Sequence, residues 1–338
     1  MNTQQTHALS LRIAIVIRTK NRPHLLNRCL QSLAAQMRVP DEIIVVNDGG
    51  SAINKIISNF PDLPIQLLNH TVSQGRSRAG NVGVQAAHSE VIGFLDDDDR
   101  FLPDHLQRLE QAMLSFDTPV VYSGCYLVQR DITGAQPLTQ EKIIGQYNES
   151  FSAERLRYEN YIPLINLLIN RDLWLKVGGF DESFNIFEDW DILSRLSEQT
   201  NFYHLDRITA EYTIWGTGQI TQSLATQQWK DAYRQFLEKH LMPLSYAEKI
   251  KLLAHYWMVS QERRSAIQKG DQENQALQRE KQASQLELLK KQQEILQSTQ
   301  EMGTYKALTE EMKIQLATRQ SQNEHLHNEL AKRDQKLA

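Results

Sequence analysis

Four consecutive aspartates, Asp96 to Asp99, directly follow the apolar stretch "VIGFL". A short apolar run bounded by polar residues predicts a buried strand, in which alternate side chains share a face. If that strand continues through the acidic run, Asp96 and Asp98 point together into a cleft, and Asp97 and Asp99 point elsewhere. Two such carboxylates repel each other, which favours a hard divalent cation together with phosphate oxygens. The alternative is a solvated loop whose last aspartate caps the following helix.

Two other segments place carboxylates where a ligand could reach them. "IIVVNDGGS" ends a second strand pattern with Asp48 and two glycines, so a carboxylate could accept from a base or a ribose while the backbone approaches closely. A simple Asn-Asp turn is the alternative there. "FEDWD" brings Glu188, Asp189 and Asp191 to the start of a helical pattern. These residues could equally do no more than favour a helix N-terminus.

Strand and helix patterns alternate along the segment that must position these groups. Strands are expected at "LRIAIVIRT", "EIIVVND", "PIQLLNH" and "VIGFLDDDD", each followed by a helical pattern, and shorter strands at "NFYHL" and "TAEYTIW". This order predicts an α/β fold with a mostly parallel sheet and helices on both faces. Ligands bind such sheets at the carboxyl ends of the strands, which here read "RTKN", "NDGG", "NHTVSQG" and "DDDDR".

The composition argues against several classes of protein. The 37 basic and 41 acidic side chains nearly balance, which argues against a chain that coats nucleic acid. Two cysteines without CxxC spacing, Cys29 and Cys125, exclude a zinc ribbon and favour a reducing compartment. The first residues lack the features of a signal peptide, and no apolar run approaches the roughly 18 to 20 residues of a membrane span. We therefore expect a cytoplasmic protein without a transmembrane segment, whose contact with a membrane, if any, is peripheral and at its inner face.

From Gln261 onward the sequence is rich in Gln, Glu, Lys and Arg. A heptad register set by Leu288 and Ile295 gives an imperfect apolar seam. The other apolar positions of the seam are Ile267, Leu277, Met302, Tyr305, Met312, Leu316, Leu326, Leu330 and Leu337, and its polar positions include Lys281, Lys291, Arg319, Asn323 and Arg333. The pattern predicts a coiled coil from about residue 265 that needs a partner chain, either a second copy or another enzyme. A fraying helix or a disordered tail is the alternative.

Taken together, the motifs resemble those of the family 2 glycosyltransferases, which bind a nucleotide-sugar on a GT-A fold. The resemblance spans roughly residues 12–221, through "IAIVIRTKNRPHLLNRCLQSLAAQ", "EIIVVNDGGS", "SQGRSRAGNVGVQAAHSEVIGFLDDDD" and "VGGFDESFNIFEDWDILSRL". It implies a metal-dependent, inverting transfer of a hexosyl group from a nucleotide-diphosphate sugar to a hydroxyl of a glycan or lipid-linked acceptor. We expect three regions: a flexible N-terminus at 1–10, the GT-A domain at 11–245 and a helical extension at 246–338.

The resemblance also implies roles for single residues. Five residues would contact the nucleotide-sugar: Thr19, Asp48, Arg78, Asp96 and Asp97. Asp98 would be the principal ligand of a divalent metal, Mn²⁺ or Mg²⁺, with Asp96 as the second ligand, nearer the ribose. Asp189 would be the general base, because the acceptor hydroxyl must lose its proton as the diphosphate leaves. Three residues would position the acceptor or the donor sugar: Gly179, Glu188 and Trp190.

The sequence departs from the family pattern at Asn47, where relatives often carry a first aspartate, at Gly80, in the place of an arginine, and at Trp215, near the place of a histidine. Trp215 could instead close over the donor sugar or belong to the core. Two other functions stay open. A sugar-phosphate nucleotidyltransferase has a similar acidic site but usually a glycine-rich loop after its first strand, and "RTKNRPH" contains no glycine. A non-catalytic scaffold would carry an inactive transferase-like domain on the coiled coil.

Overall fold

A computed structural model of the chain describes residues 10–130, 141–215 and 226–261, and scattered positions between 265 and 321. The chain divides into two compact units, Met1–Trp257 and Met258–Ala338. The described positions of the second unit are helical, and Met312 among them is exposed. The other apolar residues of the expected coiled-coil seam, like residues 1–9, lie outside the described residues. The coiled coil therefore stays a prediction.

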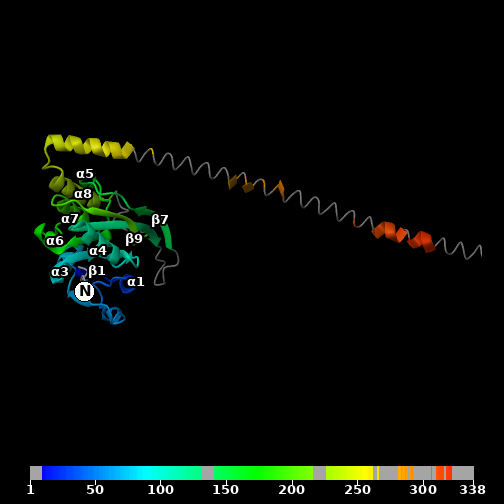
Figure 1. Cartoon of the computed structure of the whole chain (residues 1–338), viewed down its shortest axis with the longest axis horizontal. Coiled ribbons are helices and arrows are strands. Elements are labelled where there is room, and N and C mark those ends of the chain that lie inside the picture. The colour runs from blue at the N-terminus through cyan, green and yellow to red at the C-terminus, as the bar shows by residue number, and fades with distance from the viewer. Residues whose placement is uncertain are drawn as a thin grey trace, which may run out of the picture. The chain divides into compact units, whose positions relative to one another are not determined.

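The first unit contains a mixed sheet flanked by helices (Figure 1). Its strand order is β3-β2-β1-β4-β8-β6-β9-β5, and β7 pairs with β6. The first strands of the chain pair in parallel: β1 (Ile13–Thr19), β2 (Glu42–Asp48), β3 (Ile65–His70) and β4 (Val91–Phe94). The later strands bring in antiparallel pairs: β5 (Arg100–Phe101), β6 (Val120–Arg130), β7 (Glu141–Tyr147), β8 (Leu167–Asn170) and β9 (Tyr203–Trp215).

Helices cover both faces of the sheet, as the alternating pattern predicts. The longer ones are α1 (Pro23–Ala34), α3 (Arg76–Ala86), α4 (His105–Phe116), α7 (Glu188–Ser197) and α8 (Gln227–His240). The short ones are α2 (Asn54–Ile57), α5 (Ala153–Leu156), the 3₁₀ turn η1 (Leu164–Asn166) and α6 (Arg171–Lys176). A further helix covers residues 246–261. In the described ranges, no helix is both long enough and apolar enough to cross a membrane.

The two faces of β1 explain why its first five residues are all apolar. Ala14 and Val16 join the core that α3 and α7 cover, whereas Ile15 and Ile17 join the core that α1 and α4 cover. Both sets are fully buried, as is usual for a parallel strand between two helical layers. The apolar part of β1 between the two layers of helices therefore ends at its carboxyl end, where Arg18 and Thr19 lie.

Two details of the strands differ from the prediction. The segments expected as two short strands form the single strand β9, whose pairing with β6 shifts register around Gly124 because residues between Leu205 and Ile208 bulge out of the ladder. Strand β4 ends at Phe94, so the acidic run lies in the turn that follows it. The predicted alternation of Asp96 and Asp98 against their neighbours is wrong for this reason.

Candidate active site

The four aspartates form what we call the acid turn, residues 96–99. The turn closes where the backbone N–H of Asp99 donates to the carbonyl oxygen of Asp96 over 3.0 Å. A turn directs its side chains separately, and each carboxylate here meets a different set of partners. The acid turn therefore has several chemically distinct positions in place of one paired site.

Asp96 is held by Arg18, which rises from the end of β1. Arg18 donates through Nε and Nη2 to the two carboxylate oxygens of Asp96, each over 2.8 Å. Its remaining nitrogen, Nη1, donates to Oε1 of Glu188 over 3.1 Å. Burial alone would lower the pKa of Arg18, but the carboxylates of Asp96 and Glu188 raise it above its ordinary value. Arg18 is thus a permanent buried cation between the acid turn and the first turn of α7.

Glu188 lies at the start of α7 with its side chain 2 % exposed. Its Oε1 is 3.5 Å from Nη1 of Arg76, which opens α3. Burial raises the pKa of Glu188, and Arg76 and Arg18 oppose that shift. Glu188 therefore lies between Arg18 and Arg76, which both approach the same carboxylate oxygen.

Asp97 and Asp98 share Arg22, which lies just before α1. Arg22 contacts both oxygens of Asp97, and its Nη1 is 3.1 Å from Oδ2 of Asp98. The hydroxyl of Thr19 donates to Oδ2 of Asp97 over 2.6 Å, and the indole N–H of Trp215 donates to Oδ2 of Asp98 over 2.9 Å. Burial raises the pKa of Asp97 to about 7 even though Arg22 lies beside it. The side chain of Asp97 is completely buried, whereas that of Asp98 is 17 % exposed.

Asp99 does not cap a helix. Its Oδ1 accepts the backbone N–H of Thr213 over 2.7 Å, which fastens β9 to the acid turn. Burial raises the pKa of Asp99 well above its usual range. Its role is to hold the strand that carries Trp215 and Tyr212 against the turn.

Asp48 ends β2 and organises the loop that leads into α3. Its two oxygens accept from Nδ1 of His70 (2.7 Å), Oγ of Ser73 (2.6 Å) and the backbone N–H groups of Gln74 (2.8 Å) and Gly75 (3.1 Å). Burial works against ionisation, yet these hydrogen bonds lower the pKa of Asp48. The carboxylate is therefore ionised and fixed at the sheet edge.

Asp189 follows Glu188 in the first turn of α7. Its Oδ1 accepts the N–H of Trp190 over 2.7 Å, and its Oδ2 accepts from Nδ2 of Asn160 over 3.1 Å. In the described part of the chain Asp189 has no ion-pair partner, unlike the first three aspartates of the acid turn. Asp191 is different again, because it is fully buried and pairs with Arg195, Lys239 and His240.

Three residues of the sequence prediction have their contacts outside the acid turn. Trp190 is 4 % exposed, donates to the carbonyl of Leu156 and stacks on Phe236 at 3.8 Å between ring centroids. Gly179 has φ +67°, and a Cβ there would lie 2.7 Å from Oδ1 of Asn81. Arg78 is exposed on α3 and pairs with Glu182 at 3.1 Å. These contacts lie in other parts of the fold, and the roles predicted for the three residues stay predictions.

Sequence reasoning missed several groups that the fold brings to the site. They are Arg18, Arg22, Arg76, Asn160 and Tyr212. Tyr212 is part-buried on β9; burial raises its pKa well above the usual range, and Asp99 and Asp189 add to the shift. The available signal was "RTKNR", a polar segment directly after a buried strand, together with "GRSR" at the start of a helix. Only the fold shows which carboxylate each arginine meets.

The donor atoms of the acid turn suit a hard cation with few protein ligands. Oδ1 of Asp98 accepts no hydrogen bond from the described residues, whereas both oxygens of Asp96 are engaged by Arg18. Within the described ranges, no group of three His, Cys, Asp or Glu side chains could hold a metal by itself. Such a site fits Mg²⁺ or Mn²⁺, which commonly take one or two carboxylates and complete their coordination with water and substrate phosphate.

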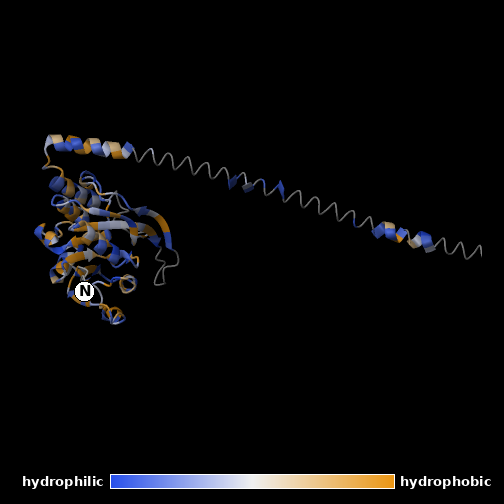
Figure 2. Ribbon diagram, viewed as in Figure 1, coloured by the Kyte–Doolittle hydropathy of each residue, from blue (hydrophilic) through white to orange (hydrophobic). Residues whose placement is uncertain are grey.

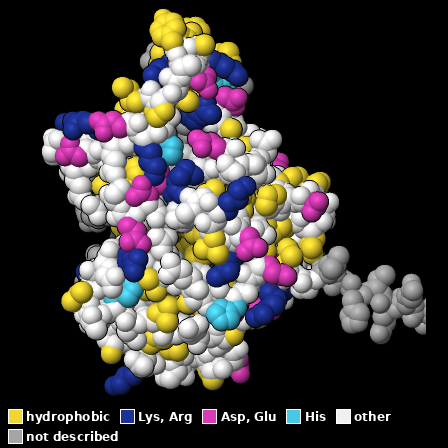
Figure 3. Space-filling model, turned by 90° about the vertical axis from the view of Figure 1, so that its left-hand side faces the viewer, with side chains coloured by type: hydrophobic (Ala, Val, Ile, Leu, Met, Phe, Trp, Pro, Cys, Tyr) yellow, Lys and Arg dark blue, Asp and Glu magenta, His cyan; other side chains and the backbone are white. Residues whose placement is uncertain are grey.

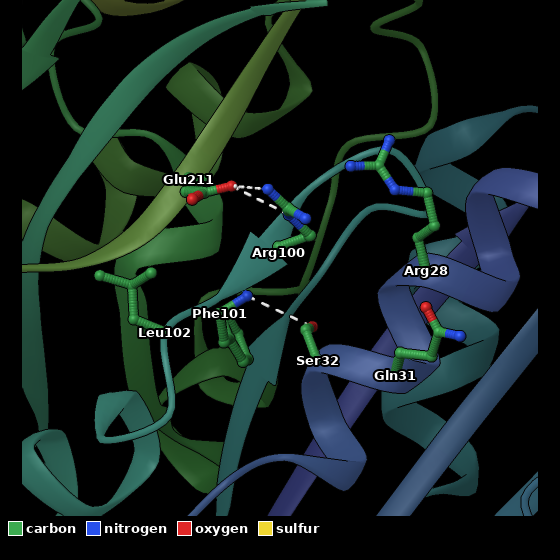
Figure 4. Close-up of a pocket in the computed structure, with 7 residues that line it drawn as sticks. All are labelled: Arg28, Gln31, Ser32, Arg100, Phe101, Leu102 and Glu211. Carbon is green, nitrogen blue, oxygen red and sulfur yellow. Dashed lines mark hydrogen bonds and ion pairs between the residues drawn. The ribbon is translucent and has the colours of Figure 1, made fainter. Parts of the chain in front are cut away.

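A cavity of about 300 Å³ lies beside α1, β5 and β9 (Figure 4). Its arginines already have acidic partners: Nε of Arg100 donates to Glu211 over 2.9 Å, and Glu141 pairs with both Arg100 and Arg28. Acidic and basic side chains likewise intermingle on the face seen in Figure 3, without a large area of one sign. The charged side chains that line this cavity are therefore already paired.

Comparison with known proteins agrees with this arrangement. Residues 14–173 match the family model described as "Glycosyl transferase family 2". An uncharacterized glycosyltransferase, YwdF of Bacillus subtilis, is 28 % identical over 205 residues, which cover 61 % of this chain and 74 % of that protein. The chondroitin synthase of Pasteurella multocida is also 28 % identical, over 64 % of this chain but 22 % of its own length.

Solved structures show a similar fold. S. aureus TarS 1–349 in complex with UDP-GlcNAc superposes with a TM-score of 0.55 at 17 % identity, over 73 % of this chain and 72 % of that one. The mannosyltransferase PcManGT from Pyrobaculum calidifontis, in complex with GDP-Man and Mn²⁺, gives a TM-score of 0.54 at 15 % identity, over 70 % of this chain and 66 % of that one. The first unit thus has the GT-A fold.

Proposed function

The chain belongs to family 2 of the glycosyltransferases, and we propose that it transfers a sugar, with inversion at the anomeric carbon, from a nucleoside-diphosphate sugar to a hydroxyl of a glycan or a lipid-linked acceptor. One observation carries the proposal. The Arg18 guanidinium contacts Asp96 at 2.8 Å and Glu188 at 3.1 Å, so a single buried cation joins the acid turn to the helix turn that bears Asp189. A donor site and an acceptor base would then be adjacent.

On the donor side, Asp48 would accept from the nucleotide base and the acid turn would lie under the diphosphate. A divalent cation held by Asp98, with Asp96 beside it, would neutralise the charge that grows on the leaving diphosphate. Arg22 and Arg76 would add cationic groups at the same edge. The complexes of TarS with UDP-GlcNAc and of PcManGT with GDP-Man and Mn²⁺ support a nucleotide-sugar donor and a divalent metal.

On the acceptor side, Asp189 would remove the proton of the attacking hydroxyl. A general base needs a carboxylate that is not neutralised by a neighbouring cation, and Asp189 is partly exposed and bonded to the neutral amide of Asn160. Asn160 would keep one carboxylate oxygen in place without adding a positive charge beside it. The first turn of α7 fixes the backbone, so the base and the acid turn would keep their separation during the reaction.

The rival functions receive less support. The match to glycosyltransferases over residues 14–173 disfavours a nucleotidyltransferase, and the intact carboxylates Asp48, Asp98 and Asp189 disfavour a scaffold without activity. The C-terminal segment, with its heptad pattern, would bring two copies together or dock the enzyme to a partner of the same glycan pathway.

A transfer assay tests the proposal. The full chain would be incubated with a panel of UDP- and GDP-sugars, Mn²⁺ or Mg²⁺ and glycan acceptors, and release of nucleoside diphosphate would be followed with and without a chelator. We expect turnover with at least one donor, its loss in chelator, and its loss in Asp98→Asn and Asp189→Asn proteins. Full turnover in either variant would remove that residue from the mechanism.

A further inference from the structure

The cavity beside α1, β5 and β9 is lined mainly by polar and charged side chains. Hydrophobic and hydrophilic residues are interleaved along the helices of the first unit (Figure 2), and α1 buries its leucines while Arg28 and Gln31 line the cavity. Arg100 of β5 and Glu211 of β9 lie on the other side (Figure 4). Its volume of about 300 Å³ is at the lower end of the range for small-ligand sites.

The arginines at this cavity outnumber the carboxylates that neutralise them. Glu141 pairs with three of them: Arg28, Arg100 (2.9 Å) and the buried Arg130 (3.2 Å). Glu211 pairs with Arg100 and Arg130, each at 2.5 Å. Three guanidinium groups thus share two carboxylates. In the described part of the chain, this cluster holds one positive charge more than it holds negative ones.

Arg28 is the least compensated of the three arginines. Among the described residues, its Nη2 alone has an acceptor, Oε1 of Glu141. Burial lowers the pKa of Arg28, and the positive charges of Arg100 and Arg130 lower it further, although Glu141 opposes the shift. An anion beside Arg28 would offset this repulsion between like charges.

The remaining N–H groups define the chemistry of a ligand. Nε and Nη1 of Arg28 and Nη1 of Arg100 donate to no group in the described ranges. The two side chains are 24 % and 28 % exposed, so a small ligand can reach both. Guanidinium groups bind the oxygens of carboxylates and phosphates through charge-assisted hydrogen bonds. Donors from two arginines at a cluster with excess positive charge therefore suit an oxyanion better than a neutral sugar.

We propose that this cavity binds one oxyanion, a phosphate or a sugar carboxylate, between the guanidinium groups of Arg28 and Arg100. A free or esterified phosphate and an acidic glycan would present the same kind of oxygen atoms to the arginines. Arg100 directly follows the acid turn in the chain, so the oxyanion site adjoins the candidate active site. The proposal does not rest on the transfer reaction.

Arginine-specific modification of the full chain tests the site residue by residue. Without divalent metal, the protein would react with phenylglyoxal in buffers of equal ionic strength that contain chloride, phosphate, glucuronate, or chloride with glucose. Mass spectrometry of its peptides would give the rate at each arginine. We expect phosphate or glucuronate to slow the modification of Arg28 at least about fivefold, because the bound oxyanion covers its guanidinium. Arg234, whose side chain is 64 % exposed on α8, is the internal control and should keep its rate.

The pattern of protection identifies the ligand. Protection of Arg28 by phosphate alone or by glucuronate alone would support the proposal and name the source of the oxyanion. Equal rates at Arg28 in all four buffers would overturn it. So would equal slowing at Arg28 and Arg234, or slowing by glucose that matches that by the oxyanions.

Thermal melts of the full chain test the charge balance with the oxyanion that protects Arg28 better. A ligand that binds only the folded state raises the melting temperature. Arg28→Gln should increase the concentration that gives half of this effect at least about tenfold, whereas Glu141→Gln should decrease it, because the excess positive charge then doubles. Arg12→Gln, which breaks an exposed pair with Glu42, should match the parent.

A response to the oxyanion that survives unchanged in Arg28→Gln would overturn the proposal. A response that Arg28→Gln keeps and Arg76→Gln loses would overturn it as well, since the anion would then bind at the start of α3. Weaker binding by Glu141→Gln than by the parent would contradict the charge balance on which the site rests.

Discussion

At the scale of single residues, Arg18 organises the site. It follows five apolar residues of β1, directly before Thr19 at the end of the strand, and it is 7 % exposed. Its two acidic partners lie 78 and 170 residues away in the sequence. A buried cation of this kind is stabilised by its ion pairs. Its removal is costly, because it leaves the negative charges of its partners buried and unpaired.

Replacing Arg18 by Met should therefore destabilise the domain by about 3 to 5 kcal/mol. Urea unfolding would measure the change in the free energy of unfolding. Adding Glu188→Gln to the Arg18→Met chain should recover part of the loss, because one buried charge fewer is left unpaired. Arg12→Met, which breaks an exposed pair with Glu42, should cost less than about 1 kcal/mol. Equal effects of the two arginine substitutions would show that Arg18 does not bridge the carboxylates.

Asp97 predicts a pH dependence of stability. Its pKa is raised to about 7 by burial, above the value of about 3.9 expected in the unfolded chain. The folded protein therefore holds an additional proton between these values, and the stability contributed by Asp97 is complete below about pH 4 and lost as the pH rises through 7.

An Asp97→Asn chain cannot ionise at this position and escapes that loss. Relative to the parent it should gain roughly 2 to 3 kcal/mol between pH 5 and pH 8. Thermal melts of both proteins at intervals across this range would measure the trend, with Asp62→Asn, at an exposed residue, as the control. A difference between Asp97→Asn and parent that does not change with pH would contradict the assignment.

Asp189 predicts a separation of chemistry from donor binding. Asp189→Asn should lower kcat by about 10²- to 10⁴-fold, because the amide cannot take the proton of the acceptor hydroxyl. The Michaelis constant for the donor should change little, since the acid turn is untouched. Initial rates at varied donor concentration would measure both, with Glu198→Gln near the other end of α7 as the control. An increase in the donor constant without a fall in kcat would place Asp189 in donor binding.

At the scale of elements, α3 shows how a departure from the family pattern is accommodated. A Cβ at Gly80 would lie 2.5 Å from the ring of Phe180, and one at Gly83 would lie 2.4 Å from Cγ1 of Val16. The helix lies close on β1 and on the loop before α7 because these positions lack side chains. An arginine at position 80 would not fit, so the basic group at this edge is Arg76, in the first turn of the same helix.

Gly83→Ala should thus destabilise the domain although alanine is the better helix former by about 1 kcal/mol. Overpacking against the buried Val16 should cost about 1 to 3 kcal/mol, for a net loss of up to 2 kcal/mol. Chemical denaturation would measure it. Gln85→Ala, at an exposed position of the same helix, should stay within about 0.5 kcal/mol of the parent. A more stable Gly83→Ala protein would show that α3 can move off the sheet.

The elements also show which features the sequence could predict. Successive residues of β1 are buried in the cores on opposite faces of the sheet, which leaves a continuous apolar run in the sequence. Runs of this kind allowed the order of strands and helices to be predicted from the sequence through α4. The orientation of the four aspartates could not be read from that pattern, since it depends on where the ladder of β4 stops. Likewise, Trp190 sits among acidic residues in the sequence, and only its contact with Phe236 reveals it as core.

At the scale of the whole molecule, three loops meet at the carboxyl edge of the sheet. Asn21, after β1, accepts the backbone N–H of Ser51 over 2.8 Å and so ties the first loop to the one that follows Asp48. Arg18 ties the acid turn to α7. The positions of Asp48, the acid turn and Asp189 at one edge were predictable from strand ends and family resemblance. Their coupling through arginines was not, because it arises between residues far apart in the chain.

Calorimetric titration of the donor nucleotide tests the central claim, that the acid turn serves the donor and α7 serves the acceptor. UDP and GDP would each be titrated with Mn²⁺ into the parent, Asp98→Asn and Asp189→Asn proteins, and again with chelator. We predict that the parent and Asp189→Asn bind one of the nucleotides with similar affinity, and that chelator or Asp98→Asn weakens binding at least tenfold. Equal binding by Asp98→Asn and the parent, or an equal loss in both variants, would contradict the division of roles.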